Sequence, residues 1–186
     1  MIDQKKIEQA VELLLEGIGE DPGRAGLIET PARVARMYAE LCAGKLDDAS
    51  KHLARTFSVS GNDLVIERDI MFHSLCEHHL LPFFGHVHIG YVPCGRVVGL
   101  SKLARLVEVF ARRLQLQERM TAQIADALME QLAPQGVIVM IEAEHLCMAM
   151  RGVAKPGTWT TTLAVRGIIE QDPEIEQRFF RMLGRP

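Results

Sequence analysis

Residues 63–92 read DLVIERDIMFHSLCEHHLLPFFGHVHIGYV, and their pattern indicates the centre of a sheet. Between residues 64 and 72 apolar side chains alternate imperfectly with acidic ones, and between residues 84 and 92 valine, isoleucine and tyrosine alternate with histidine and glycine. A period of two is typical of half-buried antiparallel strands. The stretch therefore predicts two neighbouring strands joined by a turn that contains Cys-Glu-His-His.

The chain before this hairpin is predicted to be helical. Apolar residues recur at helical spacing from Ile7 to Ile18, and Glu-Asp-Pro-Gly at residues 20–23 then breaks the segment. A second helix is expected to have Thr30 as its N-cap and to stop at Gly44.

Two helices and two further strands are predicted after the hairpin. Ser101 can cap the first helix, and the second runs from near Gln117 to Pro134. Residues 137–148 and 158–169 are predicted strands, and Asp172 begins a short C-terminal helix. This order predicts an α+β domain with a four-stranded antiparallel sheet and a helix pair between the second and third strands.

Composition narrows the class of protein. A chain of 186 residues with 48% hydrophobic and 24% charged residues suits one compact unit. A net charge of −3 and a pI of about 6.2 exclude the global basic field that draws proteins to nucleic acid or to anionic membranes. The first residues form neither a signal peptide nor a membrane span, so we expect a cytoplasmic protein with reduced thiols.

Two separate pairs of residues predict a metal site. Cys76 and His79 are three positions apart and can face one ion from a tight turn, and His145 and Cys147 are expected to share one face of the strand 137–148. Cys76, His79 and Cys147 would leave the fourth tetrahedral position open, which is typical of hydrolytic zinc sites. A structural zinc or simple burial of thiols fits the same spacing.

His52 and His73 give no specific signal, and four other histidines divide into two groups. His78 and His145 lie beside the predicted ligands, where an imidazole can serve as general acid or base. His86 and His88 are expected to be ordinary solvent-facing strand residues.

A second group of residues is suited to binding an anion and a nucleobase. Ser101, Lys102 and Arg105 lie at the start of a predicted helix, where free N–H groups favour phosphate. Arg151 follows Cys147 by four positions and would share its face if the strand continued. For any single lysine or arginine, a solvated basic face is the commoner explanation. Glu118, with Gln117, can either cap the next helix or accept the N–H and NH₂ edge of guanine.

Four ordered motifs resemble the GTP cyclohydrolase I family over nearly the whole chain. They are CEHHLLPF at 76–83, GLSKLAR at 99–105, QLQERMT at 115–121 and HLCMAMRG at 145–152. Residues 29–38, ETPARVARMY, are also similar to the N-terminal helix of that family.

The resemblance implies a fold, an assembly and a reaction. The fold is a tunnelling-fold subunit, with an N-terminal helical region at 1–62 and a catalytic domain at 63–186 in one structural unit. The assembly is a toroidal homodecamer, an allosteric enzyme with active sites between subunits. The reaction converts GTP and water into 7,8-dihydroneopterin triphosphate and formate, the first step of tetrahydrofolate and pterin synthesis.

Carried over residue by residue, the resemblance also implies site roles. One zinc ion per subunit is expected on Cys76, His79 and Cys147. The expected catalytic residues are His78, His145 and Ser101, with a protonated His145 drawing charge through N7 of the purine while activated water attacks C8. The expected substrate contacts are Glu118 and Gln117 for guanine, Ser101, Lys102, Arg105 and Arg151 for the ribose-triphosphate, and Arg33 and Arg36 from a neighbouring subunit.

Three other classes of protein fit parts of the sequence. A zinc deaminase would show H-x-E followed by P-C-x-x-C, but Pro93-Cys94 has no second cysteine after it. A non-catalytic, zinc-stabilised oligomer would give His78 and His145 no role. A pterin synthase or a nitrile-forming deazaguanine enzyme would share the fold but lacks the Cys-His-Cys set.

Overall fold

The sequence 63–92 forms the hairpin at the centre of the sheet. In a computed structural model that describes residues 1–184, β2 (Val65–Cys76) pairs antiparallel with β3 (Pro82–Val92). The last two residues of the predicted domain 63–186 lie outside the described residues. β3 pairs with β6 (Gly136–His145) without interruption from Phe83 to Val92, and β6 pairs with β7 (Trp159–Gly167). The four antiparallel strands predicted from the sequence are confirmed.

A fifth strand extends the sheet at one edge. β5 (Leu114–Gln115) runs parallel to the end of β2, so that the strand order is β5-β2-β3-β6-β7. β1 (Thr56–Ser58) and β4 (Arg96–Val98) form a separate antiparallel pair. The contact between β2 and β5 places Gln115 opposite Cys76, at the end of the sheet where the predicted metal ligands lie.

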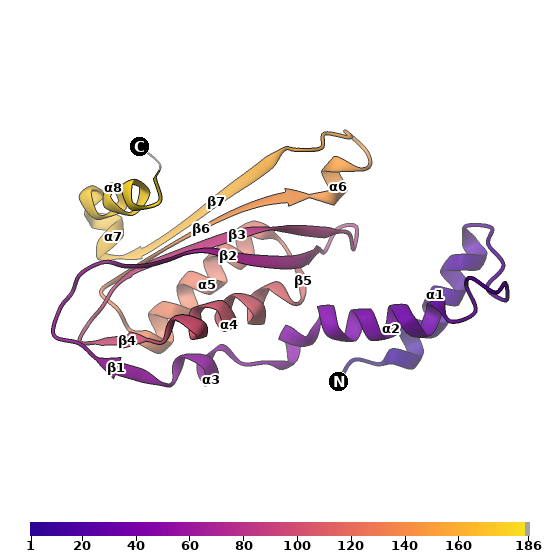
Figure 1. Cartoon of the computed structure of the whole chain (residues 1–186), viewed down its shortest axis with the longest axis horizontal. Helices are drawn as coiled ribbons and strands as arrows, with labels where there is room; N and C mark the ends of the chain where they lie inside the picture. The colour runs from indigo at the N-terminus through magenta and orange to yellow at the C-terminus, as the bar shows by residue number, and fades with distance from the viewer. Residues whose placement is uncertain (185–186) are drawn as a thin grey trace.

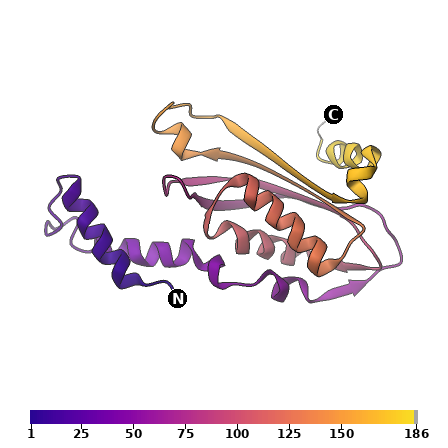
Figure 2. The same ribbon diagram turned by 180° about the vertical axis from the view of Figure 1, so that it is seen from behind.

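Helices cover one face of the sheet (Figures 1 and 2). The helix pair predicted between the second and third long strands is α4 (Leu100–Ala111) and α5 (Gln117–Leu132). Alternate residues of β3 and β6 bury their side chains against these helices, because successive side chains of a strand point to opposite faces. This arrangement confirms the α+β class predicted from the sequence and is the one expected of a tunnelling-fold subunit. The remaining helices are α1 (Gln4–Gly17), α2 (Thr30–Leu41), η1 (Ala43–Leu46), α3 (Ala49–Leu53), α6 (Leu146–Ala149), α7 (Ile168–Gln171) and α8 (Pro173–Met182).

The two ends of the chain lie at opposite ends of the molecule. α1 and α2 extend away from the sheet as a helical arm, whereas α7 and α8 pack on the second face of the sheet (Figure 1). Phe179 of α8 is fully buried there together with Ile138 and Met140 of β6. These residues form a second, smaller hydrophobic core between α8 and the sheet. Full burial of a phenylalanine side chain contributes about 1.5–3 kcal/mol to stability.

The close approach of β3 and β6 depends on Gly85. A Cβ atom added to Gly85 would lie 1.9 Å from the carbonyl oxygen of Glu142, a distance that no side chain can occupy. Only glycine therefore permits this close pairing. The same register places Phe83 opposite His145.

Three predictions about local structure are wrong. Thr30 is the first residue of α2 and not its N-cap, which is Glu29, and Gly99 takes the N-cap position of α4 that was expected of Ser101. The strand expected to reach residue 148 ends at His145, and the chain turns into α6. Helix ends are set by backbone angles and by packing on the neighbouring elements, which short polar residues alone do not specify.

His88 is not solvent-facing, contrary to the sequence interpretation. Its side chain is 4% exposed, its Nδ1 accepts a hydrogen bond of 3.2 Å from the backbone N–H of Asp69, and its Nε2 lies 3.6 Å from Glu142. His86, on the same face, is partly buried. Neighbouring strands and an acidic partner cover these histidines, and alternation along one strand does not reveal such cover.

No helix among residues 1–184 combines the length and the apolar character needed to span a bilayer.

Candidate metal centre and active site

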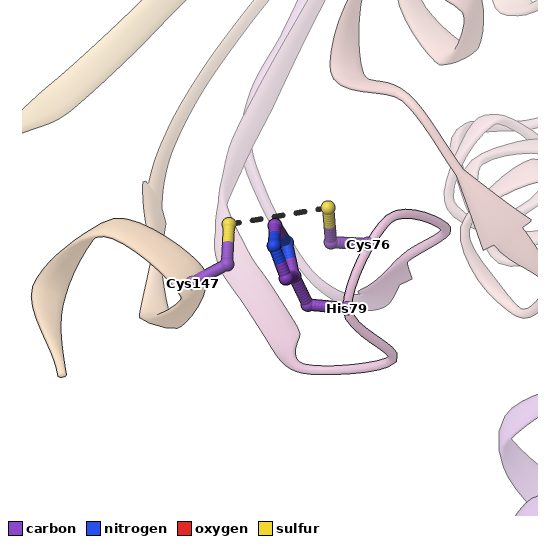
Figure 3. A group of neighbouring side chains, drawn as sticks. All are labelled: Cys76, His79 and Cys147. Atoms are coloured by element: carbon purple, nitrogen blue, oxygen red, sulfur yellow. Dashed lines mark hydrogen bonds between the residues drawn. The ribbon is translucent and has the colours of Figure 1, made fainter. Parts of the chain in front are cut away.

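The metal site predicted from sequence assembles at the end of the sheet. Cys76 is the last residue of β2, His79 follows in the turn toward β3, and Cys147 lies in α6, so three ligand atoms lie within 4.8 Å of one another (Figure 3). Figure 3 shows the imidazole of His79 between the two cysteines, which approach from different elements. These three residues form the only such group of metal-binding side chains among the described residues.

The distances fit a tetrahedral zinc site. The sulfur atoms of Cys76 and Cys147 are 3.9 Å apart, and two sulfurs bonded to one tetrahedral zinc at about 2.3 Å lie about 3.8 Å from each other. Burial raises the pKa of the Cys147 thiol, and the neighbouring Cys76 raises it further. A divalent cation reverses this effect because it stabilises both thiolates. The donor set therefore suits zinc, with three protein ligands.

The turn that carries His79 is held by backbone hydrogen bonds. The N–H of Leu80 donates to the carbonyl of Cys76 at 2.9 Å, and the N–H of Cys76 donates to the carbonyl of Leu81 at 2.8 Å. Leu80 adopts a positive φ of 57°. Such left-handed conformations cost a non-glycine residue of the order of 1–3 kcal/mol and cluster at functional sites. The fold thus maintains a strained turn at the point where two ligands emerge.

His145 is oriented by a buried glutamine. The Oε1 atom of Gln117 lies 2.8 Å from Nε2 of His145, and the ring of Phe83 stacks on the imidazole at 4.6 Å with an interplanar angle of 2°. The Gln117 side chain is buried, and its Nε2 donates to the carbonyls of Ile141 and Thr160 at 3.0 and 2.9 Å. Because carbonyl oxygens only accept, these bonds fix which end of the amide faces His145.

The glutamine therefore selects one tautomer of His145. Its Oε1 accepts, so Nε2 of His145 carries the proton and Nδ1 is left as the acceptor. Desolvation by burial lowers the pKa of His145, and the negative charge of Glu118 opposes this effect. The neutral imidazole therefore predominates near neutral pH.

A cavity of about 520 Å³ joins these groups. It is lined by residues from the β2–β3 turn, the start of α5 and the segment after β6, and eight predicted site residues line it: Cys76, His78, His79, Gln117, Glu118, His145, Cys147 and Arg151. His78 and Glu118 are exposed at its surface. The strand that was expected to continue toward Arg151 ends at His145. The guanidinium of Arg151 nevertheless contacts the imidazole of His79.

The other predicted residues lie elsewhere in this chain. Ser101, Lys102 and Arg105 are on the first turns of α4, and the far end of that helix leads into β5 at the metal site. A helix of 12 residues is about 18 Å long. Arg33, paired with Glu29 at 3.3 Å, and Arg36 are exposed on α2 in the helical arm. One chain thus brings together the metal ligands and the base-facing groups but leaves five predicted residues apart.

The sequence analysis missed the groups that support the site. Phe83, Thr162 and Thr121 are examples: Thr162 accepts from Nε2 of Gln117 at 3.1 Å and lies 2.7 Å from the hydroxyl of Thr121. The run of threonines at 160–162 was visible in the sequence. Only the register of β7 on β6 shows that the carbonyl of Thr160 and the hydroxyl of Thr162 both accept from Gln117.

The family model and the similar sequences agree on one family. A model of the family described as GTP cyclohydrolase I matches residues 7–184. The protein named GTP cyclohydrolase 1 from Clostridium perfringens (strain 13 / Type A) is 57% identical over 184 residues, covering 99% of this chain and 100% of its own length. The protein of the same name from Streptococcus sanguinis (strain SK36) is 55% identical over 183 residues, covering 98% and 100%. Among solved structures, the archaeosine synthase QueF-Like in its apo form aligns with a TM-score of 0.46 and 19% identity, over 56% of this chain and 93% of that one.

Proposed function

The chain belongs to the GTP cyclohydrolase I family, and on this basis we propose that it hydrolyses GTP at C8 to give formate and 7,8-dihydroneopterin triphosphate. The observation that carries the proposal is the convergence of Cys76, His79 and Cys147 in one cavity with the oriented His145.

We assign zinc, one ion per subunit, to Cys76, His79 and Cys147. When bound, zinc supplies Lewis acidity and lowers the pKa of water for attack at C8 of the purine. Three protein ligands favour this catalytic use, because structural zinc sites generally have four. Thiolate ligands also require a reducing compartment, which supports a cytoplasmic location.

The protein's own side chains would bind and orient the purine. Glu118 lines the cavity at the start of α5, where its two carboxylate oxygens can accept from the N–H and NH₂ groups of guanine. Gln117 would act through His145, since its side-chain amide is already occupied by the sheet and by that imidazole. Fixing the base in this way holds C8 in one position, which contributes to rate by reducing the entropy lost in the reaction.

Two histidines would transfer protons. In the free protein His145 is neutral with its Nδ1 available as acceptor, because burial lowers its pKa. The negative charge of bound GTP would raise that pKa, so that Nδ1 takes up a proton from solvent and donates it to N7 of the purine. His78, exposed at the cavity, is the candidate for the later steps of ring opening and recyclisation.

We further propose that the active site is completed by neighbouring copies in a toroidal homodecamer. Ser101, Lys102 and Arg105 begin α4 at its far end from the cavity, and Arg33 and Arg36 lie on the extended arm. Only Arg151 of the expected triphosphate cations lines the cavity. Cations donated by another subunit would neutralise the remaining charge, and shared sites would also provide the coupling that an allosteric enzyme needs. In this division residues 63–186 carry the chemistry and residues 1–62 serve assembly.

The test is turnover by the purified protein. Zinc-loaded protein given GTP should release formate and a pterin that fluoresces after oxidation, in equal amounts. Protein stripped with a chelator should lose both products and regain them when zinc is restored. Inactivity of the zinc-loaded protein toward GTP would refute the proposal.

A further inference from the structure

Glu77, next to the metal ligand Cys76, takes part in two contacts that leave the cavity. Its backbone N–H donates to the carbonyl of Gln115 at 3.1 Å, and its carboxylate is paired with the guanidinium of Arg119. Neither Glu77 nor Arg119 lines the cavity. This ion pair therefore joins the metal-binding turn to the first turns of α5 from behind the site.

Arg119 is itself anchored by a buried amide. Its Nε donates to Oε1 of Gln115 at 3.0 Å, while its Nη2 is directed at Glu77. Gln115 is 1% exposed, and its Nε2 donates to the carbonyl of Phe110 at 3.0 Å and to Oε1 of Gln123 at 2.7 Å. The planar guanidinium thus uses two of its N–H groups in fixed directions, which a lysine ammonium cannot reproduce.

The same part of α5 carries the two residues that are proposed to position His145 and the purine. Gln117, which orients His145, and Glu118 immediately precede Arg119 in the sequence. The ion pair therefore connects the turn that holds two proposed metal ligands with the helix whose Gln117 orients His145. A shift of the turn relative to α5 would change the distance between the metal and the base.

We propose that Arg119 is a positioning residue that sets the metal affinity of the site by holding the Cys76–His79 turn through Glu77. The inference rests on the proposed zinc function. The turn needs such support because Leu80 has a left-handed φ of 57° and His79 is exposed to solvent. A turn released from α5 must be ordered again when metal binds, and that ordering weakens binding.

The size of the effect follows from the kind of contact. Loss of an outer partner of a metal ligand typically weakens metal binding by about 10–100-fold. The side chains of Arg119 and Glu77 are 42% and 32% exposed, so solvent screens the pair. We therefore expect the lower end, about tenfold.

The experiment measures zinc affinity in competition with a chromophoric chelator and records the visible spectrum of the cobalt-substituted protein. Arg119→Gln and Glu77→Gln should each raise the Kd for zinc by about tenfold, and the double variant should be no weaker than either single one. Arg119→Lys should restore only part of the affinity. The cobalt bands should shift in Arg119→Gln, because the ligand geometry changes.

Arg166→Gln is the matched control. Arg166 pairs with Asp126 of α5 at 2.7 Å and is 33% exposed, so the substitution removes a similar ion pair from the same helix. Its zinc affinity should equal that of the wild-type protein.

Several results would overturn the inference. Unchanged affinity and spectrum in Arg119→Gln, an equal loss in Arg166→Gln, or additive losses in the double variant would each do so. If Arg119→Gln fails to fold by circular dichroism, Glu77→Gln on the turn decides the matter by the same criterion. Such failures leave zinc binding and GTP turnover by the wild-type protein intact, whereas a wild-type protein that binds no zinc would refute the proposed function as well.

Discussion

The two ends of α4 differ in how much of an active site one chain builds. At the C-terminal end, β5 meets Cys76, and the metal ligands, His145 and Glu118 surround one cavity. At the N-terminal end, Ser101, Lys102 and Arg105 lie apart from that cavity, on a surface of their own. A hydrogen bond to the buried Gln117 orients His145, whereas none of the side-chain hydrogen bonds found among residues 1–184 involves Ser101, Lys102 or Arg105. We therefore interpret one chain as carrying only part of the proposed active site.

The strongest test of the metal end is removal of a ligand. Cys147→Ala should abolish GTP turnover and weaken zinc binding by more than about 100-fold, because a direct ligand matters more than the outer partners that cost 10–100-fold. Zinc content after gel filtration and formate release provide the two measurements. Cys94→Ser, at an exposed cysteine in the turn between β3 and β4, should leave both unchanged. Full turnover in Cys147→Ala would show that the cysteine is not a ligand.

Acid–base chemistry can be separated from metal binding at His145. His145→Ala should lower kcat by about 10²–10⁴-fold, the usual contribution of a positioned acid or base, while the protein still binds zinc. Steady-state kinetics with zinc analysis measures both. The control is His73→Ala, which removes an exposed imidazole stacked on Phe84 outside the cavity. A variant that lost zinc together with activity would argue for a ligand role instead.

The glutamine behind His145 should have a smaller effect of the same kind. Gln117→Leu frees the imidazole to rotate and to change tautomer, so we expect kcat to fall by about 10–100-fold, as for other outer partners. In a His145→Ala background the same substitution should add little, because the two residues act as a unit. Independent, multiplying losses would mean that Gln117 acts on GTP directly.

The sequence predicted the three metal-binding residues better than the residues that hold them in place. Cys76 and His79 lie within one short turn, and the two strands that frame it alternate clearly, so local spacing was sufficient. The predicted role of Cys147 depended on its lying on one face of a strand that continued past residue 147, but β6 ends at His145. The thiols of Cys147 and Cys76 still lie close together, because α6 brings Cys147 back toward the turn after β2.

Long-range packing explains what the sequence did not predict. His88 looked exposed because it alternates with Val87 and Ile89, yet the side chains of Glu142 and Asp69 come from two other strands to cover it. The link from Arg119 to Glu77 joins residues 42 positions apart and has no local signal at all. Contacts of this kind become visible only when the packing of strands, turns and helices is known.

The N-terminal end of α4 gives the comparison its sharpest test. Lys102→Ala should raise KM for GTP by about 10–100-fold, in line with hydrogen bonds to a charged group worth about 1.5–3 kcal/mol. If the cation serves a neighbouring copy, mixing this variant with inactive Cys147→Ala subunits should restore about a quarter of the wild-type activity at limiting GTP, because a quarter of random pairings join two intact halves. No recovery after subunit exchange would place both halves in one chain.

The smallest expected effect concerns the pKa of His145 and ties the two sides of the cavity together. Burial lowers this pKa and Glu118 partly offsets the effect, so Glu118→Gln should lower it further in metal-free protein. An NMR titration of the His145 ring measures the shift, and Glu130→Gln, at an exposed site further along α5, should leave it unchanged.

The lowered pKa of His145 also makes the stability of the fold depend on pH. Because the folded-state pKa of His145 lies below the unfolded value, its contribution to stability is complete above the unfolded pKa and is lost as the pH falls through the folded pKa. In Glu118→Gln the folded pKa is lower, so the loss of stability should continue to a lower pH than in the wild-type protein. Urea unfolding at a series of pH values measures this. A rise in the His145 pKa on removal of the carboxylate would mean that Glu118 does not stabilise the protonated imidazole, and the proposed proton transfer at N7 would then depend on the charge of bound GTP alone.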